Sequence, residues 1–311
     1  MKYFKILFSI VLIIILSCTN QNKLDPKQGY FEMPDGKIWY EVYGTGNSTP
    51  LLLIHGGPGG YMCGMFTIKN VCDNRSLIFY DQLGSGRSEI TVDTTLWQLP
   101  YFVRNLDRLI DSLKINEVHL LGHSWGASIA VEYYLTDSTN KVKSMILAGP
   151  LLSTKLWIED ANYLRSQLPD SIQSVLSYHE KNGSIDSEEY LSATSYFYSR
   201  YNQLQPIPEN INCDNGKSNE AIYNYMWGPT EFYATGNLRD YDRIDRLDEI
   251  NVPVLIIVGE YDEARPETME KVKKLFPNAM LEVIKDAAHA SFNDKPDEFN
   301  RIVDNFINSI E

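Results

Sequence analysis

The chain has 311 residues, of which 43% are hydrophobic, and carries a formal net charge of −13. A chain of this length buries roughly 75% of the surface exposed by its unfolded form, so it can build one large domain with an insertion. The negative charge excludes a nucleic-acid-binding protein, because neutralising phosphates requires a basic surface that this sequence does not offer.

A charged and then apolar segment opens the chain. Lys2 and Lys5 precede an apolar run over residues 6–16. This run is too short for a comfortable membrane-spanning helix, which needs about 20 residues. Residues 15–18, with the sequence Ile-Leu-Ser-Cys, resemble the lipobox of bacterial lipoproteins, in which the cysteine is lipidated and becomes the new N-terminus.

We therefore expect a lipoprotein signal over residues 1–18, with the lipid on Cys18, and a polar tether without fold over residues 19–28. The domain would be exported and anchored to a bacterial membrane, on its periplasmic or cell-surface face. An uncleaved N-terminal anchor is the alternative, and it would also export the domain.

The other cysteines are Cys63, Cys72 and Cys213. In an exported protein they are candidates for oxidation, and their odd number leaves at least one unpaired. A disulfide between Cys63 and Cys72 is one alternative, but buried free thiols are the preferred interpretation. No cysteine or histidine spacing indicates a metal site, and no cofactor is expected.

Strand-like and helix-like segments alternate along most of the chain. Several of the strand-like segments are apolar on both faces, as buried parallel strands are. They cover residues 37–43, 51–55, 76–80, 118–122, 143–148, 254–259 and 280–284. Helical patterns cover residues 101–113, 126–135, 267–276 and 296–310. This alternation predicts an α/β fold with a mostly parallel sheet covered on both sides.

The alternation stops over residues 151–240, where the sequence becomes helical, polar and rich in tyrosine. We interpret this segment as a helical cap inserted between the two parts of the core, residues 29–150 and 241–311. Such an insertion would lie over the carboxyl ends of the strands, where open α/β sheets form their active sites.

Residues 122–126, with the sequence Gly-His-Ser-Trp-Gly, follow a predicted strand and open a predicted helix. This setting is typical of a nucleophile elbow, a tight turn whose flanking glycines avoid collisions with the neighbouring strand and helix. Ser124 is therefore the candidate nucleophile. A bare G-x-S-x-G pattern arises by chance in on the order of one in ten chains of this length, so its context must support it.

Three further segments supply that context. Residues 55–60 (His-Gly-Gly-Pro-Gly-Gly) follow an apolar strand and predict a loop that presents a backbone N–H to an oxyanion. Asp262 follows the strand at 254–259, and His289 lies in a loop before the last helix. The order Ser124, Asp262, His289 is that of the catalytic triad in α/β hydrolases.

Other residues compete for two of the triad roles. His55 and His123 are alternative histidines, but each lies inside a motif and before the acid in the sequence. Asp286 and Glu260 are alternative acids, although Glu260 still belongs to the end of its strand.

Four motifs together resemble those of the proline iminopeptidase family, in the branch similar to the tricorn-interacting aminopeptidase. They are residues 55–59 (HGGPG), 80–88 (YDQLGSGRS), 122–126 (GHSWG) and 228–232 (GPTEF). The resemblance extends over about residues 30–310, cap included. The expected lipoprotein signal departs from the family, whose members are mostly cytosolic.

The resemblance implies an α/β-hydrolase fold and a serine aminopeptidase. It implies Ser124 as the nucleophile, with Asp262 and His289 as its partners. It also implies that the backbone N–H groups of Gly57 and Trp125 form the oxyanion hole.

Two glutamates are further implied to hold the free α-ammonium of the substrate: Glu231 in the cap and Glu263 beside the triad acid. An exopeptidase must measure the distance from a charged terminus to the scissile carbonyl, and fixed carboxylates do so while rejecting blocked or internal bonds. Without the resemblance, Glu231 would be interpreted as a solvated cap residue.

The sequence therefore predicts a serine aminopeptidase that needs no cofactor and acts through an acyl-enzyme. It would release an N-terminal proline or another apolar residue from short peptides with a free N-terminus. An esterase or small-amide hydrolase on the same scaffold is the alternative within enzymes. A binding lipoprotein that has kept the fold and lost the chemistry is the alternative from another class.

Overall fold

The computed structural model describes residues 27–71, 74–137, 139–208, 211 and 216–311. Within these residues an eight-stranded sheet forms the centre of the molecule, in the order β1-β2-β4-β3-β5-β6-β7-β8. β1 and β2 pair antiparallel with their neighbours, whereas β3 to β8 run parallel. The strands are β1 (Lys27–Met33), β2 (Gly36–Tyr43), β3 (Ser48–Ile54), β4 (Arg75–Tyr80), β5 (Val118–His123), β6 (Val142–Ala148), β7 (Val254–Gly259) and β8 (Ala279–Ile284).

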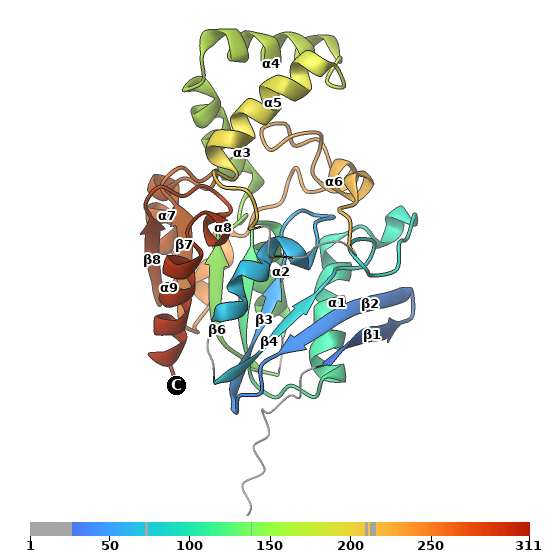
Figure 1. Ribbon diagram of the computed structural model, residues 1–311, viewed down its shortest axis with the longest axis vertical. Coiled ribbons are helices and arrows are strands. Elements are labelled where there is room, and N and C mark those ends of the chain that lie inside the picture. The colour runs from blue at the N-terminus through green and yellow to red at the C-terminus, as the bar shows by residue number, and fades with distance from the viewer. Residues whose placement is uncertain (1–26, 72–73, 138, 209–210, 212–215) are drawn as a thin grey trace, which may run out of the picture.

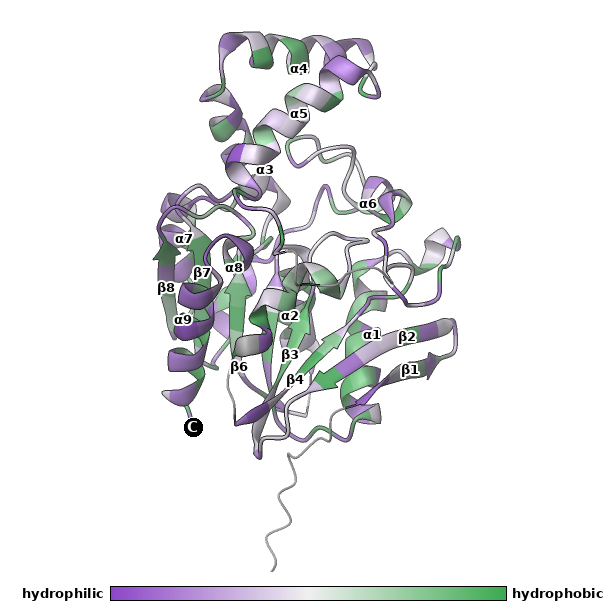
Figure 2. Cartoon of the chain, in the orientation of Figure 1, coloured by the Kyte–Doolittle hydropathy of each residue, from purple (hydrophilic) through white to green (hydrophobic). Residues whose placement is uncertain are grey.

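Apolar side chains of one strand alternate between the two faces of this sheet. Leu52 and Ile54 of β3 contribute to a buried cluster shared with α1, α2 and α7. Leu51 and Leu53 contribute to a second cluster, shared with α8, α9 and a 3₁₀ segment. Figure 2 shows the central strands mainly green and the covering helices mixed in hydropathy. These elements are α1 (Leu99–Ser112), α2 (Trp125–Thr136), α7 (Pro266–Lys273), α8 (Ser291–Asp294), α9 (Pro296–Asn308) and the 3₁₀ segment Met62–Asn70.

The predicted α/β class with a mostly parallel sheet is confirmed. The ends of the predicted strands and core helices lie within three residues of those in the structure. One strand was not predicted, because β1 lies at the edge of the sheet and only Met33 of it is fully buried. The expected tether is wrong at its end, since Lys27 and Gln28 already pair with Val42 and Glu41 of β2.

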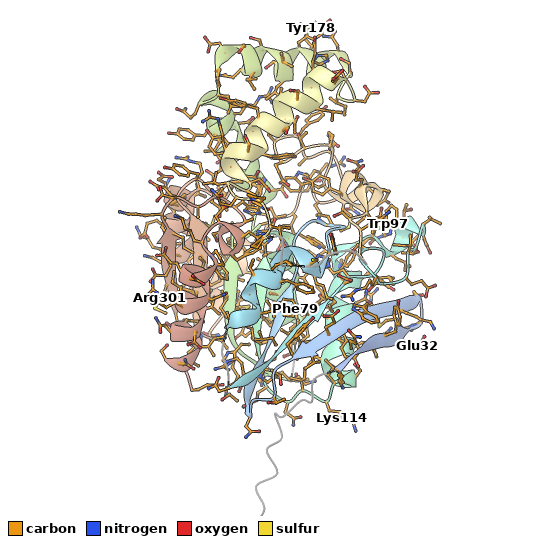
Figure 3. The ribbon with its side chains drawn as sticks, viewed as in Figure 1. Glu32, Phe79, Trp97, Lys114, Tyr178 and Arg301 are labelled. Carbon is orange, nitrogen blue, oxygen red and sulfur yellow. The ribbon has the colours of Figure 1, made fainter. Side chains whose placement is uncertain are left out.

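A cap stands above the carboxyl ends of the parallel strands (Figure 1), between β6 and β7. Its helices are α3 (Thr154–Ser166), α4 (Asp170–Asn182), α5 (Glu188–Tyr201) and α6 (Glu220–Met226). α3 to α5 share a buried cluster that includes Leu164, Leu176 and Phe197. Figure 3 places Tyr178 at the end of the cap farthest from the sheet. The cap therefore has a small core of its own.

The first and last residues of the cap lie side by side on the core. The N–H of Thr154 donates to the carbonyl of Tyr241 (2.8 Å), and the N–H of Arg243 donates to the carbonyl of Leu152 (3.0 Å). These bonds fix the base of the cap next to the end of β6.

Cys63 is disulfide-bonded, so the preference for a free thiol at this position is wrong. Sequence spacing could not decide this, because an odd number of cysteines allows several pairings. The other cysteines, Cys18, Cys72 and Cys213, lie outside the described residues. In the part of the chain that is described, no helix combines the length and the apolar character needed to cross a bilayer.

Candidate active site

The turn at Ser124 joins β5 to α2 in a strained backbone conformation, with φ of 54° and ψ of −119°. A Cβ atom on Gly122 would lie 2.5 Å from the carbonyl oxygen of Gly126, and one on Gly126 would lie 2.1 Å from that of Ile54. Only glycine fits at both positions, so the sequence dictates the turn that presents the serine.

Asp262 and His289 are brought into direct contact behind this turn. Asp262 Oδ1 lies 2.8 Å from His289 Nδ1, and both side chains are buried. The carboxylate also accepts the N–H groups of Ala264 (2.8 Å) and Gly259 (3.2 Å), which fix its orientation. A carboxylate on Nδ1 places the proton there and leaves Nε2 free to accept another.

The Ser124 hydroxyl makes no hydrogen bond with His289 in the described structure. Such contacts are often long without substrate and tighten when the substrate is bound. Ser124 is 8% exposed, at the floor of the site.

The competing residues lie in other environments. The ring of His123 packs 4.5 Å from that of His289, and burial holds its pKa well below the usual value. Burial lowers the pKa of His55 to about 4. Glu260 and Asp286 are both exposed, and the N–H of Asp286 donates to a carboxylate oxygen of Glu260 (3.1 Å).

The two residues expected to supply the oxyanion hole lie beside the serine in the chain and in the loop after β3. Trp125 is the first residue of α2, so its N–H has no acceptor within the helix. Gly57 lies in the loop after β3 with φ of 125°, and a Cβ there would lie 2.6 Å from the nitrogen of Gly60. Gln82 joins the two segments, because it donates to the carbonyl of His55 (2.9 Å) and accepts from the Trp125 indole (2.9 Å).

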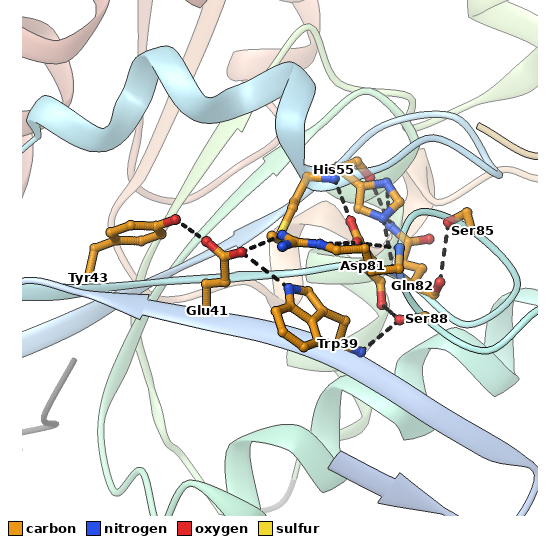
Figure 4. A network of polar contacts seen from close by, with 10 residues as sticks. Trp39, Glu41, Tyr43, His55, Asp81, Gln82, Ser85 and Ser88 are labelled. Carbon is orange, nitrogen blue, oxygen red and sulfur yellow. Dashed lines mark hydrogen bonds and ion pairs between the residues drawn. The ribbon is translucent and has the colours of Figure 1, made fainter. Parts of the chain in front are cut away.

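A polar network supports this loop from the side of the antiparallel strands (Figure 4). The Asp81 carboxylate accepts the N–H groups of Met62 and Arg87, both at 2.8 Å. The Arg87 guanidinium in turn pairs with Glu41 of β2. The network therefore joins the 3₁₀ segment that follows the glycine-rich loop to β2.

Two carboxylates lie on the cap side of the triad. Glu263 is fully buried; its Oε2 has no hydrogen-bond partner, and its Oε1 lies 3.5 Å from Asn202 Nδ2. Glu231 accepts the hydroxyl of Tyr223 at 2.6 Å. Burial, and then the nearby Glu231, raise the pKa of Glu263 well above its usual value, and burial also raises the pKa of Glu231.

Neither glutamate pairs with a lysine or arginine among the described residues. Glu263 is fully buried and Glu231 is half-buried, and carboxylates in such positions are costly without a cation, so this arrangement favours a positively charged ligand. Glu231 and the glycine-rich loop share one cavity of about 690 Å³. Its lining includes Gly57, Gly59, Tyr198, Asn202, Tyr223 and Glu231.

Comparison with known proteins agrees with this geometry. A model of the alpha/beta hydrolase fold matches residues 49–296. The proline iminopeptidase of Heyndrickxia coagulans is 38% identical, over 91% of this chain and 99% of its own. The chain belongs to the proline iminopeptidase family.

Solved structures agree with the assignment to the proline iminopeptidase family. The crystal structure of the Mycobacterium smegmatis proline iminopeptidase superposes with a TM-score of 0.83 at 31% identity, covering 91% of this chain and 98% of that one. An esterase from Exiguobacterium antarcticum, at 21% identity and a TM-score of 0.63, covers 90% of this chain and 98% of its own and shows the shared fold alone. The predicted family and hydrolase class are confirmed.

Several residues around this proline iminopeptidase site were not predicted. A Cβ on Gly149, whose φ is 49°, would lie 2.5 Å from His289 Nδ1, so only glycine allows the Asp262–His289 pair to pack there. The only signal for Gly149 was its place after a strand. Tyr198 and Tyr223 were hidden among many cap tyrosines, and sequence spacing does not tell which of them line the cavity.

Proposed function

We propose that this chain is a serine aminopeptidase that releases an N-terminal proline or another apolar residue from short peptides. The observation that carries the proposal is the pair of carboxylates, Glu231 and Glu263, placed beside the triad without a lysine or arginine partner among the described residues. The names of the curated relatives, proline iminopeptidases, support the same activity.

In this proposal the α-ammonium of the substrate, a secondary ammonium when the residue is proline, binds between Glu231 and Glu263. The scissile carbonyl then lies one residue away, at Ser124. An acetylated terminus has lost the charge, and an internal bond would place further chain where the carboxylates close the site. The Trp157 ring, 5.3 Å from that of His289, supplies an apolar wall for the side chain of the released residue.

The chemistry follows from the positions of the groups. Ser124 Oγ attacks the carbonyl carbon while His289 Nε2 takes its proton, and Asp262 stabilises the imidazolium that forms. The N–H groups of Gly57 and Trp125 stabilise the negative oxygen. His289 then protonates the leaving amine, which leaves an acyl-enzyme on Ser124. Water hydrolyses this ester by the same proton transfers in reverse order.

A pair of matched substrates tests the proposal. The purified protein should cleave unblocked prolyl or alanyl amides and leave their N-acetylated forms almost untouched, because acetylation removes the charge that the carboxylates bind. Equal cleavage of free and acetylated peptides would remove the aminopeptidase assignment and favour an esterase or amidase.

We also propose that Cys18 carries a lipid that anchors the enzyme to a bacterial membrane. The support is the sequence of residues 15–18, followed by a polar segment. The substrates would then be peptides present outside the cytoplasm.

A further inference from the structure

The loop that carries His289 is bonded to the end of a cap helix. The N–H of His289 donates to the carbonyl of Tyr201 (3.1 Å), and the N–H of Ala290 donates to the carbonyl of Asn202 (2.7 Å). α5 ends at Tyr201 and Asn202 is its C-cap, so these carbonyl oxygens have no N–H donor within the helix. In Figure 1 the lower end of α5 lies next to α8.

A buried carboxylate strengthens this junction. Asp294, at the end of α8 and 7% exposed, accepts the N–H of Ala288 on one oxygen (2.8 Å). Its other oxygen accepts the N–H groups of Leu204 (2.9 Å) and Gln205 (2.8 Å), just beyond α5. Hydrogen bonds to an ionised acceptor are roughly twice as strong as neutral ones. One side chain therefore holds the histidine loop and the cap segment together.

The same cap segment reaches the carboxylates proposed to bind the substrate amine. Asn202 lines the cavity, and its amide nitrogen lies 3.5 Å from Glu263 Oε1. The backbone that accepts from the histidine loop and the side chain that contacts the amine site thus belong to one residue. This segment therefore joins the histidine loop to the amine site.

We propose that Asp294 is a positioning residue, which clamps the His289 loop to the end of α5 and so fixes the general base relative to the amine-binding carboxylates. This inference rests on the proposed function. Asp294 touches neither the substrate nor the reacting atoms, and it acts through the backbone of residues 288–290.

Asp294→Asn is the central test. An amide offers one oxygen for three N–H groups and must turn its own NH₂ towards at least one of them. A catalytic group misplaced by about 1 Å can cost on the order of 100-fold in rate. We expect kcat to fall roughly 10- to 100-fold with little change in KM. Turnover of a simple aryl ester, which carries no amine, should fall as well, because it depends on the same histidine.

Glu311→Gln is the matched control. The Glu311 carboxylate also joins distant segments, through Arg75 (3.1 Å) and the N–H of Thr49 (3.1 Å), but at the amino ends of β3 and β4, opposite the site. This variant should lower the melting temperature and leave kcat unchanged. A loss of kcat in Asp294→Asn but not in Glu311→Gln, measured well below both melting temperatures, supports the inference.

Asp294→Glu keeps the negative charge and tests the positioning role of Asp294 if the asparagine variant does not fold. A kcat at least fivefold below the wild-type value, with a shifted pH profile, supports positioning. Wild-type kcat and an unchanged pH profile in either folded variant overturn it. Failure of the proposed function has a different signature, since the wild-type protein itself would then cleave acetylated and free peptides equally.

Discussion

Replacing Glu231 by glutamine removes one charge that faces the substrate amine and keeps an oxygen for the Tyr223 hydroxyl, which donates to it over 2.6 Å. The triad is untouched. Breaking a buried, hydrogen-bonded charge pair typically costs about 2–5 kcal/mol, much of it from the charge left unpaired. That range converts to a loss of roughly 30-fold to several thousand-fold in kcat/KM.

The assay compares an unblocked prolyl amide with a simple aryl ester that has no amine. Glu231→Gln should reduce kcat/KM for the amide within the range above and change that for the ester less than about threefold, because no charge pair is broken there. Glu263→Gln should behave in the same way. The comparison uses the pH-independent limiting values of kcat/KM, because either substitution lowers the pKa of His289. The double variant should lose less than the sum of the two, since both groups hold one ammonium.

Glu220→Gln is the matched control, because Glu220 is an exposed glutamate that lines the same cavity at the start of α6. It should leave both substrates within about twofold of wild type, as expected for an exposed charge. An equal loss on amide and ester in Glu231→Gln would mean that the triad was disturbed. Full activity on the amide would show that Glu231 does not bind the amine.

Three further outcomes are expected. Ser124→Ala should lower turnover about 10⁶-fold with an unchanged melting temperature and no labelling by a fluorophosphonate; activity within tenfold of wild type would reject Ser124 as nucleophile. Burial disfavours the His289 imidazolium, but Asp262, Glu263 and Glu231 outweigh it and raise its pKa to about 9. His289 must be neutral to act as a base, so ester turnover should rise as the pH approaches this pKa. Glu263→Gln removes one group that raises the pKa of His289, so the rise should occur at lower pH. An unchanged pH profile in this variant would contradict the assignment. Cys18→Ser should give an unprocessed or soluble species on fractionation, and wild-type behaviour would mean that Cys18 is not the anchor.

The sheet could be predicted because its strands are apolar on both faces. Leu51 to Ile54 form an unbroken apolar run, since each face of β3 has its own buried cluster. The Asp262–His289 contact also follows from simple rules, because both residues come after neighbouring parallel strands, β7 and β8, whose carboxyl ends meet at one edge.

Features that depend on a single exposed face or on distant segments could not be predicted. β1 buries little, and its apolar residues Tyr30 and Phe31 are adjacent, so its residue types do not alternate. The hydrogen bond between Asp294 and Leu204 joins residues 90 positions apart, and no local sequence pattern predicts it. The same holds for Gln82, whose contacts with His55 and Trp125 connect three different strand ends.

Two carboxylates that lie close together with no lysine or arginine beside them make the free enzyme less stable than its hydrophobic core would allow. Burial raises the pKa of both carboxylates, and Glu231 raises that of Glu263 further. A bound ammonium offsets this cost, so folding and occupancy of the site are linked, and the amine product stabilises the native state by mass action. Variants selected for thermal resistance alone would tend to lose Glu231 or Glu263, as strained sites exchange activity for stability. The carboxylates that bind a peptide terminus therefore make the free energy of unfolding larger with ligand bound than without it.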